Sequence, residues 1–277
     1  MTTIRVAHSP DSDDAFMFWA VLHGEVDAEG LELVAETHDT EALNALADEE
    51  RIDVLAVSAA RYGTIADRYV LLPHGASVGR GYGPVVVARE PRTLASLSGK
   101  RVAVPGPRTT AYLVLRILLD AFEPVVVPIA PYETVWRTLR DGEVDAALVI
   151  HEGRLTYERE GFALVCDIGR AWTDAKGLPL PLGVNVIRRG LGPELIARVS
   201  RVCARSIAWA LAHRDRLMRE MTNTPLDAAG LDRYLAMYAN ADTQAMAPDV
   251  VRAMAELFSE ARKRGLLATT PVIELAP

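Results

Sequence analysis

Short apolar runs and longer amphipathic stretches alternate along the first two-thirds of the chain. The apolar runs have the length of buried strands, and the stretches between them have the spacing of helices. This alternation is typical of βα units around mainly parallel sheets, so we expect an α/β fold. The expected strands are 4–7, 31–35, 54–57, 85–88, 101–104, 125–129, 146–150 and 163–166, and the expected helices are 14–23, 40–48, 59–67, 109–121 and 132–141.

The pattern changes after about residue 190, where only helical segments follow. We expect these helices at 193–221, 227–239 and 247–264. Helices that bring no new strand bury their apolar faces against a sheet that already exists. The C-terminal third is therefore expected to pack on a sheet formed earlier in the chain.

Two segments of the chain, 46–58 and 139–151, resemble each other. Each reads as the end of a helix, a turn and a buried strand, and they finish in Ser58 and His151. Because α/β sheets bind ligands at the carboxyl ends of their strands, the similarity favours two lobes that present these residues to one crevice. The alternative is that helix–turn–strand units simply look alike.

Extended stretches at 85–92 and 181–188 flank the middle of the chain and are expected to cross between the lobes. The first lobe would comprise residues 1–88 and 187–277, and the second lobe residues 89–186. The glycine-rich stretch 75–83 precedes the first crossing. It could hinge the lobes, let the backbone approach a ligand closely, or be a plain flexible loop.

Composition narrows the class of protein. The chain has 277 residues, of which 50% are hydrophobic and 24% are charged, which is typical of a folded globular protein. Its net charge of -7, with no block of Lys or Arg, argues against nucleic acid or an acidic membrane as a partner. No apolar window has transmembrane length, and the first residues lack a leader pattern, so we expect a cytoplasmic protein. The oligomeric state is open, and a homodimer is compatible with the sequence.

Cofactor motifs are absent from the sequence. The glycines at 79–83 lack the spacing and the strand–helix context of a dinucleotide fingerprint, and there is no phosphate-binding Walker loop. The two cysteines, Cys166 and Cys203, fit buried free thiols. We therefore expect neither a cofactor nor a metal.

Polar segments follow several of the expected strands. The first, 9–16, supplies Ser9, Asp13 and Asp14 at the start of a helix. Helix capping alone would explain most of the Ser and Asp residues of this segment. If they face a ligand, the carboxylates would repel an anion, so a hydroxyl or amide group is the better guest.

The segment 105–112 is the expected anion site. A tight turn leads into a helix, and the first amides, at Thr109, Thr110 and Ala111, can face a carboxylate. Arg108 could add a charge-assisted contact to the same ligand. The expected ligand is therefore a small anionic carboxylate.

His151 follows the apolar run 146–150, at the end of a strand that should face the ligand. An imidazole has a reference pKa of about 6.5 and can accept a proton near neutral pH. No second histidine lies at metal-ligand spacing, so a general base is favoured over a zinc ligand. The structural alternative is a histidine buried in the core or at a hinge.

Four sequence segments resemble the 1,4-dihydroxy-6-naphthoate synthases, enzymes of the futalosine route to menaquinone. They are Val104-Pro-Gly-Pro-Arg-Thr-Thr-Ala-Tyr112, Val149-Ile-His-Glu152 with Thr156-Tyr157, Gly177-Leu-Pro-Leu-Pro-Leu-Gly183, and Gly79-Arg-Gly-Tyr-Gly-Pro-Val-Val-Val-Ala-Arg89. The resemblance implies a type II periplasmic-binding-protein fold. It also implies cleavage of cyclic de-hypoxanthinyl futalosine to 1,4-dihydroxy-6-naphthoate and a sugar-derived fragment.

The same resemblance implies roles for individual residues. His151 would be the general base, and Ser58, Thr109 and Thr110 would line the pocket. The first loop departs from the family pattern Ser-Pro-Cys-Pro-Asn-Asp-Thr-Phe, because Asp13 stands in place of the amide. Arg108 stands where a histidine often precedes the paired threonines.

Two other functions fit the sequence. One is the chorismate dehydratase of the same pathway, which acts on a smaller carboxylated ring. The other is a solute-binding protein without catalysis that takes a small carboxylate.

Overall fold

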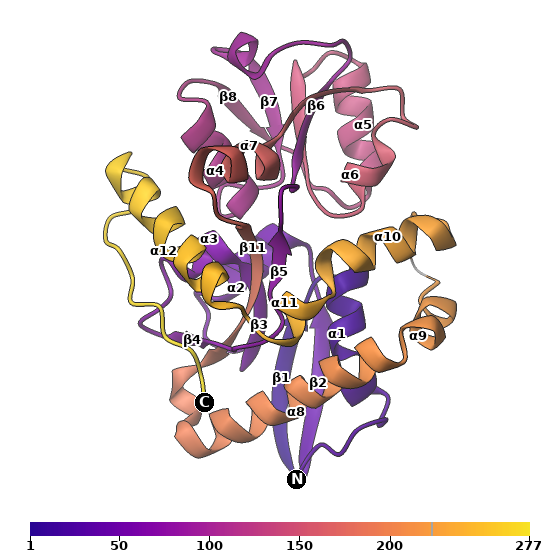
Figure 1. Ribbon diagram of the computed structural model, residues 1–277, viewed down its shortest axis with the longest axis vertical. Helices are drawn as coiled ribbons and strands as arrows, with labels where there is room; N and C mark the ends of the chain where they lie inside the picture. The colour runs from indigo at the N-terminus through magenta and orange to yellow at the C-terminus, as the bar shows by residue number, and fades with distance from the viewer. Residues whose placement is uncertain (223) are drawn as a thin grey trace.

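Two β-sheets carry the fold in the computed structural model, which describes residues 1–222 and 224–277 (Figure 1). The first sheet has the order β2-β1-β3-β11-β4, with β5 also paired to β11, and the second has the order β10-β6-β9-β7-β8. The strands are β1 (Thr2–His8), β2 (Leu31–Thr37), β3 (Val54–Ser58), β4 (Tyr69–Leu71), β5 (Ser77–Gly79), β6 (Val85–Ala88), β7 (Arg101–Val104), β8 (Glu123–Val126), β9 (Ala146–Val149), β10 (Ala163–Asp167) and β11 (Leu180–Arg188).

Strand pairing in both sheets is mixed, whereas the sequence pattern predicts mainly parallel sheets. β1 pairs in parallel with β2 and β3, and β7 pairs in parallel with β8 and β9. β11 and β6 run antiparallel to β3 and β9. The reason is that these two strands carry the chain from one sheet to the other. They enter their sheets at the edge where the parallel strands end, so they run the opposite way.

Helices cover both faces of each sheet, and successive residues of a strand serve opposite cores. In β6, Val86 and Ala88 pack with Trp172, whereas Val85 and Val87 pack with Trp136, as the period of two along a strand requires. The helices are α1 (Ser12–Leu22), α2 (Thr40–Leu46), α3 (Ala59–Tyr62), α4 (Thr110–Leu118), α5 (Tyr132–Arg140), α6 (Gly153–Thr156), α7 (Ile168–Lys176), α8 (Pro193–Ala212), α9 (Arg214–Glu220), α10 (Ala228–Tyr238), α11 (Ala241–Gln244) and α12 (Pro248–Lys263), with 3-10 turns η1 (Leu94–Leu97) and η2 (Arg189–Leu191).

We call the first sheet with its helices the first lobe, and β6 to β10 with α4 to α7 the second lobe. Figure 1 shows the second lobe above the first, with the chain crossing between β5 and β6 and returning from α7 into β11. Of the C-terminal helices, α8 and α10 pack on α1 of the first lobe. The predicted boundaries at 88/89 and 186/187 stay predictions; β6 belongs to the second sheet and β11 to the first.

The eight predicted strands are all present, and the differences concern other elements. The predicted helix 59–67 ends at Tyr62, and the predicted helix 193–221 divides into α8 and α9 at His213. The short elements β4, β5, α6 and α11 were not predicted, nor was α7, and β11 was expected only as an extended crossing. Among the described residues, no helix has the length and apolarity that a membrane span requires.

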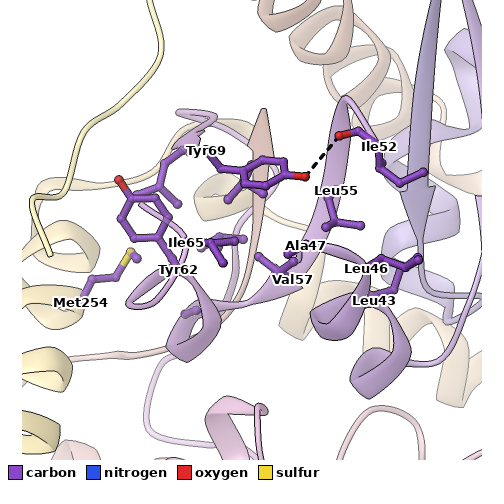
Figure 2. Packing of buried hydrophobic residues seen from close by; sticks show 14 of the residues in the cluster. Leu43, Leu46, Ala47, Ile52, Leu55, Val57, Tyr62, Ile65, Tyr69 and Met254 are labelled. Atoms are coloured by element: carbon purple, nitrogen blue, oxygen red, sulfur yellow. Dashed lines mark hydrogen bonds between the residues drawn. The ribbon is translucent and has the colours of Figure 1, made fainter. Parts of the chain in front are cut away.

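The core under β3 fixes the elements that reach the cleft (Figure 2). Leu43 of α2 and Val57 of β3 belong to one buried cluster with Tyr62 and Tyr69. The Tyr69 hydroxyl donates to the carbonyl oxygen of Ile52 at 3.4 Å. This packing holds the end of β3 and the start of α2 in place on the side of the sheet that faces the second lobe.

Candidate active site

A cavity lies between the two lobes and is lined by residues from both. Its empty space, open solvent included, is roughly 720 Å³. The lining residues are Ser9, Asp13, Asp14, Thr40, Leu43, Ala56, Val57, Ser58, Gly75, Ser77, Pro84, Thr109, Thr110, Ala111, Ile150, His151, Leu182, Gly183, Val184, Asn185, Tyr234 and Tyr238.

The structure brings together all of the predicted site residues except one. Ser58 and His151, which end the two similar sequence segments, both line the cavity. Arg108 does not. Its side chain is 43% exposed and pairs with Glu41 of α2 at 2.9 Å, and its backbone amide donates to the same carboxylate. Arg108 therefore links the lobes at the surface instead of facing the cavity as expected.

The N-terminus of α4 presents two amides to the cavity, not the three that the sequence predicts. Thr109 caps the helix because its hydroxyl accepts from the backbone amide of Tyr112. The backbone amide of Thr109 donates to the carbonyl oxygen of Gly106. The Thr110 hydroxyl accepts from the backbone amide of Ala60 and donates to the backbone carbonyl oxygen of Leu182. The hydroxyls are thus committed to the protein. The amides of Thr110 and Ala111 carry no hydrogen bond to a described residue, and helix amides so placed can bind an anion.

Ser58 adds a hydroxyl donor beside these amides. Its backbone amide donates to Oδ1 of Asn44 at 2.9 Å, and the Asn44 Nδ2 donates to the serine Oγ at 3.0 Å. Asn44 is fully buried. Because the Ser58 Oγ already accepts from the side-chain amide of Asn44, the hydroxyl proton of Ser58 is free to point at a ligand.

His151 follows β9 with a φ of 50°, in the left-handed region that residues other than glycine seldom adopt. Its Nε2 lies 2.8 Å from the Thr40 Oγ1. Its Nδ1 lies 3.4 Å from both the Tyr234 Oη and the Asp11 Oδ2. All three partners belong to the first lobe, so the ring is held by the opposite side of the cleft from its own strand.

Carboxyl groups gather near this imidazole. Burial and the negative charge of Glu152 raise the pKa of Asp11 well above its ordinary range. Burial and the charge of Asp13 raise the pKa of Asp14 to about 7. Asp13 itself accepts hydrogen bonds on both oxygens. A carboxyl that keeps its proton to neutral pH can donate a hydrogen bond as well as accept one.

Glu152 ties the second lobe to the first. Its Oε1 accepts from the backbone amide of Ser12 at 3.0 Å and from the Ser12 hydroxyl at 2.8 Å. Burial raises the pKa of Glu152, but hydrogen bonding from Asp11, the His151 ring and the Ser12 amide outweigh burial and leave the pKa below its ordinary value. Glu152 is therefore the carboxylate of the pair and Asp11 the protonated partner.

Comparisons with known proteins decide the family. A sequence family described as menaquinone biosynthesis matches residues 4–263. A curated 1,4-dihydroxy-6-naphthoate synthase of Thermus thermophilus is 41% identical over 98% of both chains. Another, from Streptomyces coelicolor, is 35% identical over 96% of this chain and 95% of the relative.

The chain belongs to the menaquinone biosynthesis family.

Solved structures agree with the two-lobed architecture of this menaquinone biosynthesis protein. A crystal structure of an Archaeoglobus fulgidus protein is 43% identical, covers 95% of this chain and 98% of its own, and superposes with a TM-score of 0.89. The alkanesulfonate-binding protein of Xanthomonas axonopodis is 14% identical, with coverages of 99% and 96% and a TM-score of 0.74. The second likeness shows the fold alone and confirms the predicted periplasmic-binding-protein fold class.

Several polar residues of the cavity in this menaquinone biosynthesis protein were not predicted. Thr40 begins the helix that follows the expected strand 31–35, so an argument like the one that singled out Ser58 could have found it. Ser77 and Asn185 lie on β5 and β11, which the sequence pattern does not reveal as strands. Tyr234 and Tyr238 come from α10, far from any strand end, and no sequence signal points to them.

Proposed function

We propose that this protein is a 1,4-dihydroxy-6-naphthoate synthase that cleaves cyclic de-hypoxanthinyl futalosine to 1,4-dihydroxy-6-naphthoate and a sugar-derived fragment. The observation that carries the proposal is the match to the Thermus thermophilus synthase, 41% identical over 98% of both chains. The cavity adds chemical support, because it combines a candidate base with an anion site in one interlobe space.

The two ends of the cavity suit different parts of such a substrate. The amides of Thr110 and Ala111, with the Ser58 hydroxyl, are donors suited to the aromatic carboxylate. The opposite end holds Asp13 and Asp14, where a second carboxylate would be repelled but sugar hydroxyls can donate. We therefore place the carboxylate at α4 and the sugar part near the carboxyl groups.

In this arrangement His151 acts as the general base. It removes a proton from the bound substrate, and the resulting negative charge leads to fragmentation. The imidazolium that forms would be stabilised by the carboxyl groups around it, and lobe closure would keep water out. A positioned base contributes about 10²–10⁴-fold in rate, or roughly 3–5.5 kcal/mol of barrier.

We further propose that the protein acts in the cytoplasm on a small carboxylate substrate. Its curated relatives are biosynthetic enzymes, which supports this compartment. Cell fractionation with detection of the protein in the cytosolic fraction tests the location.

The deciding experiment is incubation of the purified protein with cyclic de-hypoxanthinyl futalosine and detection of the naphthoate by mass spectrometry. The expected result is stoichiometric release of 1,4-dihydroxy-6-naphthoate. Conversion of chorismate instead would identify a dehydratase. Tight binding of a carboxylate without turnover would identify a solute-binding protein, and either outcome would overturn the proposal.

A further inference from the structure

The hydroxyl of Tyr234 lies between Asp13 and the proposed base. Tyr234 comes from α10 of the first lobe and is fully buried in the fold. Its Oη lies 2.9 Å from the Asp13 Oδ1 and 3.4 Å from the His151 Nδ1. The three groups form a chain that runs from the start of α1, through α10, to the second lobe.

The direction of the hydrogen bonds in this chain follows from the donors available. A phenol has one proton, and the shorter contact to Asp13 takes it. The other oxygen of Asp13 accepts from the Ser77 hydroxyl at 2.7 Å, so the carboxyl group accepts on both sides. Burial and the charge of Asp13 raise the pKa of Tyr234 well above its ordinary value, so the phenol keeps its proton and its donor role.

The Tyr234 oxygen is then left as an acceptor toward His151. Asp11 Oδ2, also 3.4 Å from Nδ1, is a second oxygen that can accept from a proton held on Nδ1. The other ring nitrogen, Nε2, contacts the Thr40 hydroxyl, which can donate to it or rotate away when substrate binds. The Nδ1 side of the ring thus favours a proton on Nδ1, and the Thr40 hydroxyl is compatible with a lone pair on Nε2 because it can act as a donor.

We infer that Tyr234, anchored by Asp13, is a positioning residue that fixes His151 in the Nδ1–H tautomer and makes Nε2 the basic nitrogen. This inference rests on the proposed function for its catalytic meaning. When Nε2 takes a proton from the substrate, the imidazolium donates from Nδ1 to Tyr234, and the phenol remains bound to the Asp13 carboxylate. The proton stays on the ring, and the negative charge of Asp13 offsets the new positive charge.

The tautomer can be measured without substrate. ¹⁵N NMR of histidine-labelled protein, with His151 assigned by comparison with His151→Asn, distinguishes the two neutral tautomers at a pH where the NMR titration shows that the ring is neutral. The expected wild-type spectrum shows Nδ1–H. Tyr234→Phe should populate the Nε2–H form. An Nε2–H ring in the wild type, or the same tautomer in both proteins, would overturn the inference.

Kinetics give a second readout. Tyr234→Phe should lower kcat about 10- to 100-fold with KM changed less than about threefold, because a base in the wrong tautomer binds substrate but reacts slowly. Asp13→Asn should have a smaller effect in the same direction. Tyr69→Phe is the matched control, since it removes a buried hydroxyl whose partner is Ile52, outside the cavity, and should leave kcat unchanged.

The outcomes separate this inference from the proposed function. A raised KM with unchanged kcat in Tyr234→Phe would make this residue a substrate contact and overturn the positioning role. If the wild-type protein failed to turn over the futalosine derivative, the proposed function would fail while the NMR result still stood. Wild-type activity with no tautomer change in Tyr234→Phe would reject the inference alone.

Discussion

Single side chains carry most of the chemistry of this cleft, and the backbone at His151 shows how one position is specified. Its φ of 50° disfavours most residues, whereas asparagine tolerates this region well. His151→Asn should therefore retain the fold and lose about 10²- to 10⁴-fold in turnover. His151→Ala should lose the same activity and also some stability. Product release under saturating substrate and urea unfolding measure the two effects, and wild-type turnover in either variant would remove His151 from the mechanism.

We predict that the free energy of unfolding depends on pH through the side chain of Asp14. Its pKa is about 7 in the folded protein, against about 3.9 in an unfolded chain. The folded state therefore binds the proton more tightly, so the free energy of unfolding falls as pH rises from about 4 to 7 and levels off above that. Asp14→Asn should be more stable than the wild type at pH 8 and similar to it at pH 4, because the amide oxygen can still accept from the Ser9 amide.

Urea unfolding at the two pH values measures this effect. Asp67→Asn is the control, because Asp67 is exposed and pairs only at the surface with Arg68. An Asp14→Asn variant that loses stability equally at both pH values would contradict the prediction.

The site residues that the sequence allows one to predict are those that follow predicted strands. Ser58 and His151 were found because a strand end in an α/β sheet has a known relation to the ligand crevice. Tyr234 was not found, because helix packing decides where its hydroxyl reaches. Arg108 was placed incorrectly because charge alone does not reveal that Glu41 of the opposite lobe pairs with it.

Among the elements, α7 shows a close approach of backbone that only glycine permits. A Cβ atom at Gly169 would lie 2.2 Å from the carbonyl oxygen of Tyr82, at the crossing between the lobes. Gly169→Ala should lower the free energy of unfolding by about 1–3 kcal/mol, because a backbone atom cannot rotate away. Gly79 and Gly83 of the glycine-rich stretch 75–83 therefore serve close packing, whereas Gly75 and Ser77 of the same stretch line the cavity.

Thermal or urea unfolding of Gly169→Ala checks this prediction. Gly230→Ala in α10 is the matched control, since the nearest atom there is the end of the Asp227 side chain at 3.1 Å, which can move. Its effect should lie within about 1 kcal/mol of the wild type. Equal losses in the two variants would show that helix position, not contact with Tyr82, sets the cost.

Elements with a strong periodic pattern were predicted, and the short or irregular ones were not. α7 was missed although its signals are present: Asp167 caps its first turn, and Gly177 ends it with a φ of 64°. β4 and β5 are three residues long, too short for a period of two to appear. β11 contains Pro181 and Gly183, which weaken a strand pattern, and its pairing depends on neighbours distant in sequence.

In the whole molecule, lobe closure depends on contacts of unequal strength. The backbone amide and the hydroxyl of Ser12 both donate to the buried Glu152. In the ion pair between Arg108 and Glu41, the arginine side chain is exposed. Loss of a buried partner costs about 1–3 kcal/mol, and an exposed ion pair is worth about 0–1 kcal/mol. Ser12→Ala should therefore raise KM about fivefold or more, and Arg108→Ala less than about threefold.

Steady-state kinetics measure both values, and small-angle X-ray scattering with and without product reports the closure. A larger effect of Arg108→Ala than of Ser12→Ala would contradict this ranking.

The two-lobed fold itself was predictable, because repeated strand–helix units and a helical C-terminal third allow few arrangements. The exact crossing points were not predictable, because strands at the border can join either sheet.

Among the described residues, the hydrogen-bonding and ionic partners of the His151 ring are Thr40, Tyr234 and Asp11, which lie across the gap. An inhibitor therefore need not touch this imidazole. A bulky carboxylate that anchors at the N-terminus of α4 and wedges the two halves apart would leave the histidine unpaired. Such a compound would select for this architecture and would spare enzymes whose bases are assembled within a single domain.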